Sequence, residues 1–506
     1  MTQLQHNEFE VAARQLQRNA EGVASPVIAV AAGDGIGPEI MNATLRILAE
    51  AGSRLDLRPV EVGESVYRSG HTSGIAPESW DILNETGLLL KAPITTPSGG
   101  GYKSLNVSLR KTFGLFANVR PCRAYAPAVA TRHPQMDLVI IRENEEDTYA
   151  GIEHRQTAEV TQCLKLISQP GSQRLCRFAF EYARAQGRPN VACFIKDNIM
   201  KLTDGLFYDA FEQVGAGYDG VARQRFIIDI GTALLADQPE RFDVIVAPNL
   251  YGDILSDVAA QLTGSVGLGG SANLGEGFAM FEAVHGSAPD IAGQDKANPS
   301  GLLQAAIMLL SYVGQDDVAL RVEKAWLKTL EDGVRTGDLR GEAEGAPPVG
   351  TQAFADAVIE RLGQEPQTMA LSRGLRGLKP IESQPAQAKQ RPYKETVGVD
   401  VFLDWDTAQR NPDVLAERLL RVAGDGLVLK LITNRGVKVW PNGNPRTFCT
   451  DHWRCRFVSE QKDGSIRHGQ IVRLLQRLNE AGVDFIKTEN LCTFDGERGY
   501  SLGQGE

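Results

Sequence analysis

Long apolar runs are absent from this chain of 506 residues. Runs such as 27–32 and 88–90 end at polar residues after a few positions, whereas a membrane-spanning helix needs about 18 consecutive apolar residues. The first 25 residues mix acidic and basic side chains and resemble neither a secretory signal nor a transit peptide. We therefore expect a soluble, cytoplasmic protein with no membrane partner.

Cysteine is scarce, and positive charge is not in excess. The seven cysteines are odd in number and scattered, which is typical of reduced thiols and not of a disulfide framework. Acidic residues outnumber basic ones by 63 to 53, a formal net charge of −10, which argues against nucleic acid as the main partner. Any anion that the protein binds must therefore meet a local cluster of basic residues.

Short apolar runs alternate with helical patterns through the first 360 residues, a pattern typical of an α/β fold. Strands are predicted at 27–32, 88–91, 137–141, 191–194, 226–230 and 243–248. Helices are predicted at 172–186, 199–214, 254–262, 301–313, 316–332 and 351–362. The order of these elements therefore predicts α/β architecture for this part of the chain.

The composition changes after residue 362. Residues 363–396 are rich in Gln, Pro, Gly and Arg and are interpreted as a linker. Beyond it, strands are predicted at 397–402 and 428–433 and amphipathic helices at 413–422 and 466–481. This part is predicted to be a separate small α+β domain.

A glycine-rich stretch, Gly33-Asp34-Gly35-Ile36-Gly37-Pro38, follows the first strand. It lacks the glycine that a dinucleotide fingerprint requires at the sixth position, so a Rossmann fold is not expected. We interpret the stretch as a tight strand-to-helix turn, with Pro38 suited to the first helical turn.

Arginines accompany glycine-rich and polar segments. Ser104, Asn106 and Arg110 follow the glycine run 99–101, and Arg120 and Arg142 lie close by in sequence. One surface arginine is usually a solvated charge, but several together can grip carboxylates in bidentate fashion, and hydroxyl and amide groups add neutral hydrogen bonds. The set predicts a small polyanionic substrate.

Two carboxylates, Asp253 and Asp257, are four residues apart and would share one helix face. Two like charges there cost about 0.2–0.5 kcal/mol unless a cation lies between them, and Mg²⁺ or Mn²⁺ would supply one. The alternative has Asp253 capping the helix and Asp257 facing water. Lys196 follows a predicted strand, where a desolvated lysine can serve in proton transfer.

Several long motifs stand in the order and spacing of the metal-dependent β-decarboxylating dehydrogenases, which this chain resembles over about residues 25–362. The motifs are 33–39, 104–110, 142–149, 196–201, 249–257 and 282–289. Within that family the chain is most similar to the isocitrate dehydrogenases. Residues 397–506 resemble the C-terminal domain of some bacterial members, including the segment 451–457.

The resemblance implies an isopropylmalate dehydrogenase-like two-domain fold. Residues 25–115 and 264–362 would form a large cofactor domain, and 116–263 a small substrate and dimer domain with 149–168 as a candidate intersubunit clasp. Residues 1–24 would be an N-terminal extension, and 397–506 an association domain.

The resemblance also implies a role for each site residue. Arg110, Arg120 and Arg142 would hold the α- and β-carboxylates of isocitrate, and Ser104 and Asn106 would meet its γ-carboxylate. Tyr149 and Lys196 would be the acid–base pair. The implied metal ligands are Asp229, Asp253 and Asp257, and the implied cofactor contacts are Thr96, Glu282, His285, Gly286, Ala288, Asp290, Ile291 and Asn298. In the family Lys196 and Asp229 come from the second subunit, which implies a homodimer.

The coenzyme expected from the sequence is NAD. NADP-dependent members typically carry Lys-Tyr after the His-Gly-x-Ala-Pro motif, where this chain has Asp290-Ile291. A carboxylate accepts hydrogen bonds from ribose hydroxyls and repels a 2′-phosphate. The expected activity is therefore NAD-dependent oxidative decarboxylation of isocitrate to 2-oxoglutarate and CO₂.

Other activities of the family are alternatives. They are NADP-dependent isocitrate dehydrogenase, a dehydrogenase of homoisocitrate, isopropylmalate or tartrate, and a non-catalytic regulatory subunit. An isopropyl group would call for apolar side chains where Ser104 and Asn106 stand, and a regulatory subunit would be expected to lack some of the catalytic residues. Isocitrate oxidation is therefore favoured.

Overall fold

The computed structural model describes residues 3–20, 22, 25–95, 104–339, 347–372, 391–407, 409–462 and 464–505. The chain divides into two compact units. The first unit consists of Met1–Ala150 and Leu166–Gln384, and the second of Gly151–Lys165 and Pro385–Glu506.

A ten-stranded sheet runs through the first unit. Four strands at one side are parallel to one another: β2 (Asp56–Pro59), β1 (Val27–Ala31), β3 (Leu88–Lys91) and β12 (Ala279–Ala283). Four at the other side are likewise parallel: β5 (Asp137–Glu143), β10 (Val244–Ala247), β8 (Asn190–Ile195) and β9 (Ala222–Ile227). Between these blocks lie β11 (Gly270–Leu274) and β4 (Ala117–Arg123), each antiparallel to its neighbours. The two blocks therefore run in opposite directions and meet at β11 and β4.

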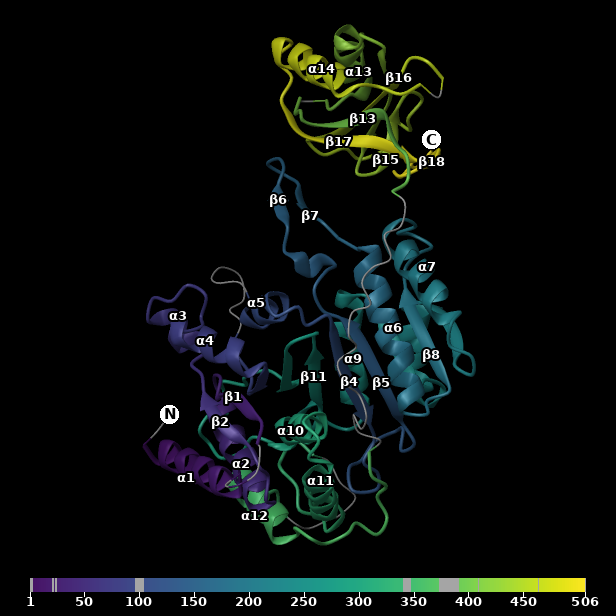
Figure 1. Cartoon of the computed structure of the whole chain (residues 1–506). Helices are drawn as coiled ribbons and strands as arrows, with labels where there is room; N and C mark the ends of the chain where they lie inside the picture. The colour runs from purple at the N-terminus through teal and green to yellow at the C-terminus, as the bar shows by residue number, and fades with distance from the viewer. Residues whose placement is uncertain are drawn as a thin grey trace. The chain divides into compact units, whose positions relative to one another are not determined.

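Helices surround each block and form two lobes (Figure 1). The lobe of the first block contains α1 (Gln3–Ala20), α2 (Gly37–Glu50), α3 (Glu64–Arg68), α4 (Pro77–Thr86), α5 (Leu105–Thr112), α10 (Ser300–Tyr312), α11 (Asp316–Glu331) and α12 (Thr351–Glu360). The lobe of the second block contains α6 (Gln169–Ala185), α7 (Thr203–Gly215), α8 (Ile228–Asp237) and α9 (Asn249–Leu262).

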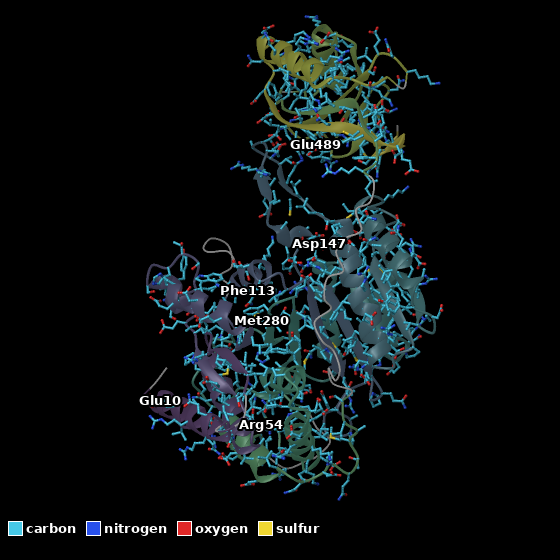
Figure 2. All side chains as sticks on the ribbon, viewed as in Figure 1. Glu10, Arg54, Phe113, Asp147, Met280 and Glu489 are labelled. Carbon is cyan, nitrogen blue, oxygen red and sulfur yellow. The ribbon has the colours of Figure 1, made fainter. Side chains whose placement is uncertain are left out.

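The sheet is covered on both faces, as strands of parallel blocks usually are. Alternate residues of β1 serve two apolar clusters: Ile28 and Val30 pack in one, and Ala29 and Ala31 in the other. The second cluster also contains Met280, which Figure 2 labels. The strands are thus held by side-chain packing above and below.

The turn 33–37 brings the start of α2 to the later part of the chain. The Ile36 amide donates to the Ser287 carbonyl (2.9 Å). Gly35 has a φ of 58°, and a Cβ at that position would lie 2.0 Å from the same carbonyl oxygen, so only glycine fits. Pro38 lies in the first turn of α2, as the sequence predicts.

The second unit is built on a six-stranded antiparallel sheet in the order β15-β14-β16-β13-β17-β18. The strands are β13 (Lys394–Asp404), β14 (Leu427–Asn434), β15 (Val437–Trp440), β16 (His452–Ser459), β17 (Phe485–Phe494) and β18 (Glu497–Arg498). Helices α13 (Pro412–Val422) and α14 (His468–Glu480) lie together on one face (Figure 1), over a core that includes Val401, Leu419 and Leu474.

A short hairpin of β6 (Glu153–Arg155) and β7 (Thr161–Cys163) belongs to this second unit. Its turn is held by Asp451, whose carboxylate accepts hydrogen bonds from the Thr157 hydroxyl and from the Glu159 amide (3.2 Å). Arg410 forms an ion pair with Glu159 at 2.7 Å. Residues some 300 positions apart are therefore joined in one unit.

The predicted fold class, an α/β isopropylmalate dehydrogenase-like part with a small α+β domain, is confirmed. Some predicted bounds are wrong: the strand 226–230 ends at Ile227, where α8 begins at Ile228, and the helix 199–214 begins only at Thr203 as α7. The predicted linker 363–396 overlaps β13, which begins at Lys394. All seven cysteines are free thiols. None of the helices within the residues that the structure describes has the length and apolar character needed to cross a bilayer.

Candidate active site

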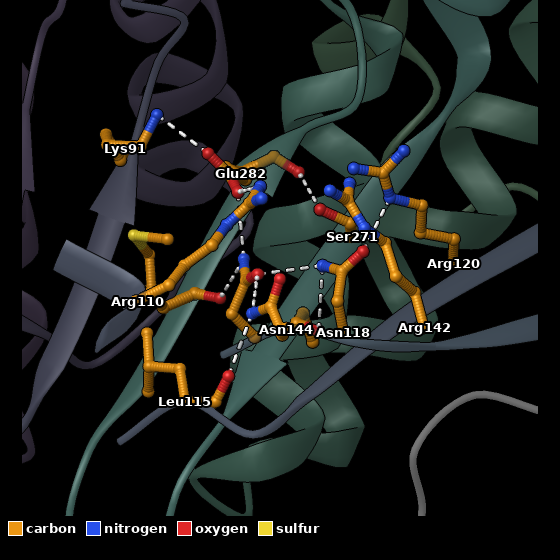
Figure 3. Close-up of polar contacts among 12 residues, drawn as sticks. Lys91, Arg110, Leu115, Asn118, Arg120, Arg142, Asn144, Ser271 and Glu282 are labelled. Carbon is orange, nitrogen blue, oxygen red and sulfur yellow. Dashed lines mark hydrogen bonds and ion pairs between the residues drawn. The ribbon is translucent and has the colours of Figure 1, made fainter. Parts of the chain in front are cut away.

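Polar side chains gather on one face of the sheet where the two parallel blocks meet (Figure 3). The register pairs Lys91 with Glu282, Asn273 with Asn118, and Asn118 with Arg142. Side chains of directly opposed residues point to the same face of a sheet. Five neighbouring strands thus present their polar groups to one place.

A cavity of about 490 Å³ opens beside this face. Its lining includes Lys91, Thr95, Asn106, Arg110, Arg120, Glu282, His285, Gly286 and Ser287. The Nε of Arg110 and the Oδ1 of Asn106 are buried and have no hydrogen-bond partner among the residues that the structure describes. Buried polar atoms in proteins are normally paired, so these two indicate a ligand with polar groups.

A buried ion-pair group forms one wall of the cavity. The carboxylate of Glu282 contacts Lys91 Nζ at 2.7 Å and Arg110 Nη2 at 2.9 Å. Burial would raise the pKa of Glu282, but Lys91 and Arg110 outweigh it and hold that pKa well below its usual range. Sequence reasoning missed Lys91, although a lysine that ends the apolar run Leu88–Lys91 was a signal.

A second group centres on Asp253, which lies on α9. Its carboxylate accepts hydrogen bonds from Arg142 Nη1 and from the Tyr149 hydroxyl (2.6 Å), and it lies 3.4 Å from Arg120 Nη1. Burial opposes ionisation, but the arginines keep the pKa of Asp253 below its usual value. Burial and the bond to Asp253 raise the pKa of Tyr149, so its phenol stays protonated.

The guanidinium of Arg142 is fixed from both sides. Asn249 Oδ1 accepts from its Nε (3.0 Å) and Nη2 (2.7 Å), and the Tyr149 ring lies 4.9 Å from its central carbon. Burial, together with the charges of Arg120 and Arg110, lowers the pKa of Arg142 to about 9. Arginine nevertheless remains charged in proteins.

The charges of the site favour an anionic ligand. Four cations (Lys91, Arg110, Arg120 and Arg142) meet three carboxylates (Glu282, Asp253 and Asp257), which leaves a net charge of +1. Because much of this charge is buried, a polyanion would be held more strongly here than in water.

Asp253 and Asp257 converge, as a shared metal ion would require. Both lie on α9, at 3.4 and 3.6 Å from the same Arg120 nitrogen. Two neighbouring carboxylates, of which Asp257 is 67% exposed, suit Mg²⁺ or Mn²⁺, which take further oxygen ligands from substrate and water. The residues present therefore fit such an ion as part of its ligand set.

Lys196 and Asp229 form a separate pair. Lys196 Nζ lies 3.0 Å from Asp229 on α8, and this contact lowers the pKa of Asp229. Within the described part of the chain, no group of three or more acidic, histidine or cysteine side chains could hold a metal ion. One copy of the chain thus brings together two of the three predicted metal ligands.

The expected cofactor residues occupy different surroundings. Glu282, His285 and Gly286 line the cavity, and the half-buried Ala288 follows them with a φ of 36°. Asn298 is buried and donates to Asp338 at 3.0 Å. Asp290 is exposed and Ile291 is half-buried. Ser104, which is expected to bind the substrate, directly precedes α5. Thr96 lies outside the described residues.

Comparisons with known proteins agree with this geometry. Residues 27–358 match the family described as isocitrate/isopropylmalate dehydrogenase, and 394–506 match the bacterial isocitrate dehydrogenase C-terminal domain. The isocitrate dehydrogenase (NADP) of Rickettsia bellii is 51% identical over 481 residues, 95% of this chain and 99% of that protein. The isocitrate dehydrogenase (NADP) of Thermus thermophilus is 42% identical over 488 residues, covering 95% and 96%. A crystal structure from Thermus thermophilus superposes with a TM-score of 0.88 at 43% identity, covering 95% and 96%.

The expectation of NAD as coenzyme, and of an NAD-dependent enzyme, is wrong. The isocitrate dehydrogenases of Rickettsia bellii and Thermus thermophilus, which match over nearly their whole length, are named as NADP enzymes. The inference rested on Asp290, whose side chain is exposed on a turn that also carries a cation. Lys296 donates to Gln294 (2.9 Å), whose amide donates to the Asp290 carbonyl (2.7 Å). A single exposed carboxylate therefore does not set the charge that a 2′-phosphate would meet.

Proposed function

This chain belongs to the isocitrate/isopropylmalate dehydrogenase family, and we propose that it is an NADP-dependent isocitrate dehydrogenase. It would oxidise isocitrate at C2, release the β-carboxyl group as CO₂ and form 2-oxoglutarate. The observation that carries the proposal is a cavity lined by the buried Arg110 and Arg120, with Arg120 also contacting the two aspartates of α9, Asp253 and Asp257.

Substrate binding would rest on the arginines. Arg110, Arg120 and Arg142 would hold the α- and β-carboxylates, since guanidinium groups bind carboxylates with paired hydrogen bonds. Asn106 lines the cavity and would meet the γ-carboxylate together with Ser104. An isopropyl group in that place would leave the buried amide unpaired, which costs about 1–3 kcal/mol. Isocitrate is therefore favoured over isopropylmalate.

The reaction needs an electron sink and a hydride acceptor. A divalent ion held by Asp253, Asp257 and Asp229 of the partner subunit would supply Lewis acidity at the C2 oxygen, and NADP would accept the hydride. The ion pairs of Asp253 with Arg142 and Arg120 keep its carboxylate ionised and available as a ligand.

Two side chains would handle the protons. Lys196 of the partner subunit would take part in removing the proton of the C2 hydroxyl as hydride leaves C2. Loss of CO₂ leaves an enol, and Tyr149 would donate its phenolic proton to C3 to give the product. The raised pKa of Tyr149, caused by burial and by the bond to Asp253, keeps that proton in place at neutral pH.

A homodimer with shared active sites is part of the proposal. Large apolar side chains are exposed beside the Lys196–Asp229 pair and beside Asp253: Ile199 (68%), Leu202 (49%), Ile230 (55%) and Ile254 (53%). Exposed apolar groups of this size gather mainly at interaction surfaces. Burying them against a second copy would bring its Lys196 and Asp229 to this active site.

A spectrophotometric assay tests the function. Purified protein is mixed with isocitrate or 3-isopropylmalate, with NADP or NAD, and with Mg²⁺ or EDTA, and the absorbance of the reduced coenzyme is followed. We expect turnover with isocitrate, Mg²⁺ and NADP, a lower kcat/KM with NAD, and none with EDTA. Preference for isopropylmalate, or undiminished turnover in EDTA, would contradict the proposal.

A further inference from the structure

Three asparagine side chains are buried next to the substrate arginines, and Figure 3 labels two of them, Asn118 and Asn144. Asn118, Asn144 and Asn273 are 0%, 3% and 0% exposed, and they come from β4, from the residue after β5 and from β11. Burying an amide costs free energy unless it is hydrogen-bonded. Each of these three buried amides therefore needs hydrogen-bond partners.

The bonds form a chain with one direction. Arg120 Nε donates to Asn118 Oδ1 (2.5 Å), Asn118 Nδ2 donates to Asn273 Oδ1 (2.8 Å), and Asn273 Nδ2 donates to Glu282 Oε1 (2.9 Å). A guanidinium can only donate and an ionised carboxylate can only accept. The two ends therefore fix the orientation of both amides between them.

Asn273 uses its full bonding capacity in this chain. Its oxygen also accepts from Asn144 Nδ2 (3.0 Å), and its nitrogen also donates to the Met280 carbonyl (3.4 Å). Glu282 in turn holds Arg110 at 2.9 Å. Asn273 thus connects an arginine on β4 with an arginine on α5, although it contacts neither.

Resting on the proposed function, we propose that Asn273 is a positioning residue that sets the guanidinium groups of Arg120 and Arg110 at the spacing that isocitrate requires. A displacement of about 1 Å in a binding group can cost up to a hundredfold in rate. A side chain that holds both arginines therefore has a direct effect on substrate binding.

An Asn273→Asp variant tests the direction of this chain of hydrogen bonds. It keeps the size of the side chain, and when protonated its new carboxyl group can still donate to Glu282 and accept from Asn118. When ionised, it instead opposes the carboxylate of Glu282. Two carboxyl groups that share a buried site do not ionise together easily, so the pKa of the pair is raised. The charged groups around the new carboxyl are Glu282, Lys91, Arg110 and, through Asn118, Arg120.

The readout is the ratio of the variant's KM for isocitrate to that of the wild type, measured at each pH. We expect this ratio to stay within about threefold near pH 6 and to exceed roughly tenfold near pH 9, because ionisation of the new carboxyl group breaks the chain of hydrogen bonds. A role confined to packing would give a ratio that does not change with pH, and that result would overturn the inference.

An Asn273→Ala variant breaks this chain of hydrogen bonds at every pH. We expect a KM for isocitrate that is raised roughly tenfold to a hundredfold, with the KM for NADP changed less than about threefold. The control is Asn434→Ala, which removes a buried, hydrogen-bonded amide from the second unit. An equal rise of both KM values in Asn273→Ala would contradict the inference.

Failure of this inference can be told apart from failure of the proposed function. If the wild type does not oxidise isocitrate, the proposed function is wrong. If the wild type is active and Asn273→Asp shows a constant ratio, only the positioning role is wrong. Should Asn273→Ala not fold by circular dichroism, the isosteric Asn273→Asp still decides the question.

Discussion

Asp253 is one of the residues on which several polar contacts of the site converge. Arg142, Tyr149 and Arg120 all contact its carboxylate, whereas Asp257 has one arginine at 3.6 Å and a side chain that is 67% exposed. The two proposed metal ligands therefore differ in the contacts that they make when no metal ion is bound. Asp253 also orders the arginines, and Asp257 is free to serve the ion alone.

This difference makes Asp257→Asn the cleaner test of the metal site. We expect kcat to fall at least about a hundredfold, since Lewis acid catalysis supplies several kcal/mol, while the melting temperature stays unchanged. Activity is measured as a function of Mg²⁺ concentration. The control is Asp317→Asn, another exposed aspartate paired with an arginine. Wild-type turnover by Asp257→Asn would contradict the assignment.

Tyr149 is predicted to act through its proton. Burial and the bond to Asp253 raise the pKa of the phenol above its ordinary value of about 10, so the acid form persists as pH rises through 9. Tyr149→Phe should lower kcat by about 10²–10⁴-fold with little change in the KM for isocitrate.

The measurement is steady-state kinetics between pH 6 and pH 9, with NADPH formation and 2-oxoglutarate formation followed separately. The kcat of Tyr149→Phe should remain low across the whole range. A rise of KM with unchanged kcat would assign Tyr149 to binding instead of proton transfer.

The sequence drew attention to the charged residues of the candidate site and not to its neutral amides. Arg110, Arg120 and Arg142 stand out because a charge near a glycine loop is unusual. Asn118 and Asn273 sit inside strands with no local pattern, and their importance appears only when the register β4·β11 places them opposite each other. Glu282 was found by resemblance, but its partner Lys91 was not.

At the scale of elements, the local sequence pattern was enough to predict the bounds of a strand or helix that is continuous and apolar. The strand Leu88–Lys91 and the helices α10 and α11 agree closely with the prediction. The strand 226–230 was extended too far because its apolar run continues, whereas β9 ends at Ile227, where its partner β8 ends at Ile195. Pairing, not the local run, sets the end of that strand.

The stability of the hairpin of β6 and β7 should depend on its contacts with Asp451. An isolated two-stranded hairpin is only marginally stable in water, so the bonds from Asp451 to Thr157 and Glu159 should matter. Asp451 is 2% exposed. Asp451→Ala should leave these groups unpaired and cost about 1–3 kcal/mol.

Hydrogen exchange followed by mass spectrometry checks this expectation. Amides of the hairpin should exchange faster in Asp451→Ala, while those of the first unit keep their rates. Glu417→Ala, an exposed substitution on α13, serves as the control. Unchanged protection of the hairpin would contradict the role assigned to Asp451.

At the scale of the whole molecule, the change in composition after residue 362 predicted a separate C-terminal part. The sequence does not reveal that 151–165 groups with it, because the contacts that join them, such as Thr157 with Asp451, span 294 positions. Contacts over that distance leave no periodic pattern in the chain.

Shared active sites predict complementation between two inactive variants. Lys196→Met and Asp253→Asn should each be inactive as homodimers. In a mixed dimer one site carries both changes and the other carries none. Random reassembly makes half of the dimers mixed, so about a quarter of wild-type activity should return. The activity of mixed and unmixed samples after dissociation and refolding is compared, and no recovery would contradict shared sites.

The last prediction concerns removal of residues 391–506. The second unit has its own apolar core around Val401 and Leu474, and the residues proposed for catalysis all lie in the first unit. The truncated enzyme should therefore keep its reaction and its preference for NADP. It should lose thermal stability, because the hairpin 151–165 loses its bonds to Asp451 and Arg410. We expect the melting temperature to fall by at least a few degrees, in line with about 1–3 kcal/mol from the hairpin contacts. Calorimetry and light scattering coupled to gel filtration check stability and oligomeric mass. An unchanged melting temperature and mass, with loss of response to a small-molecule effector, would indicate a regulatory domain instead of an association domain.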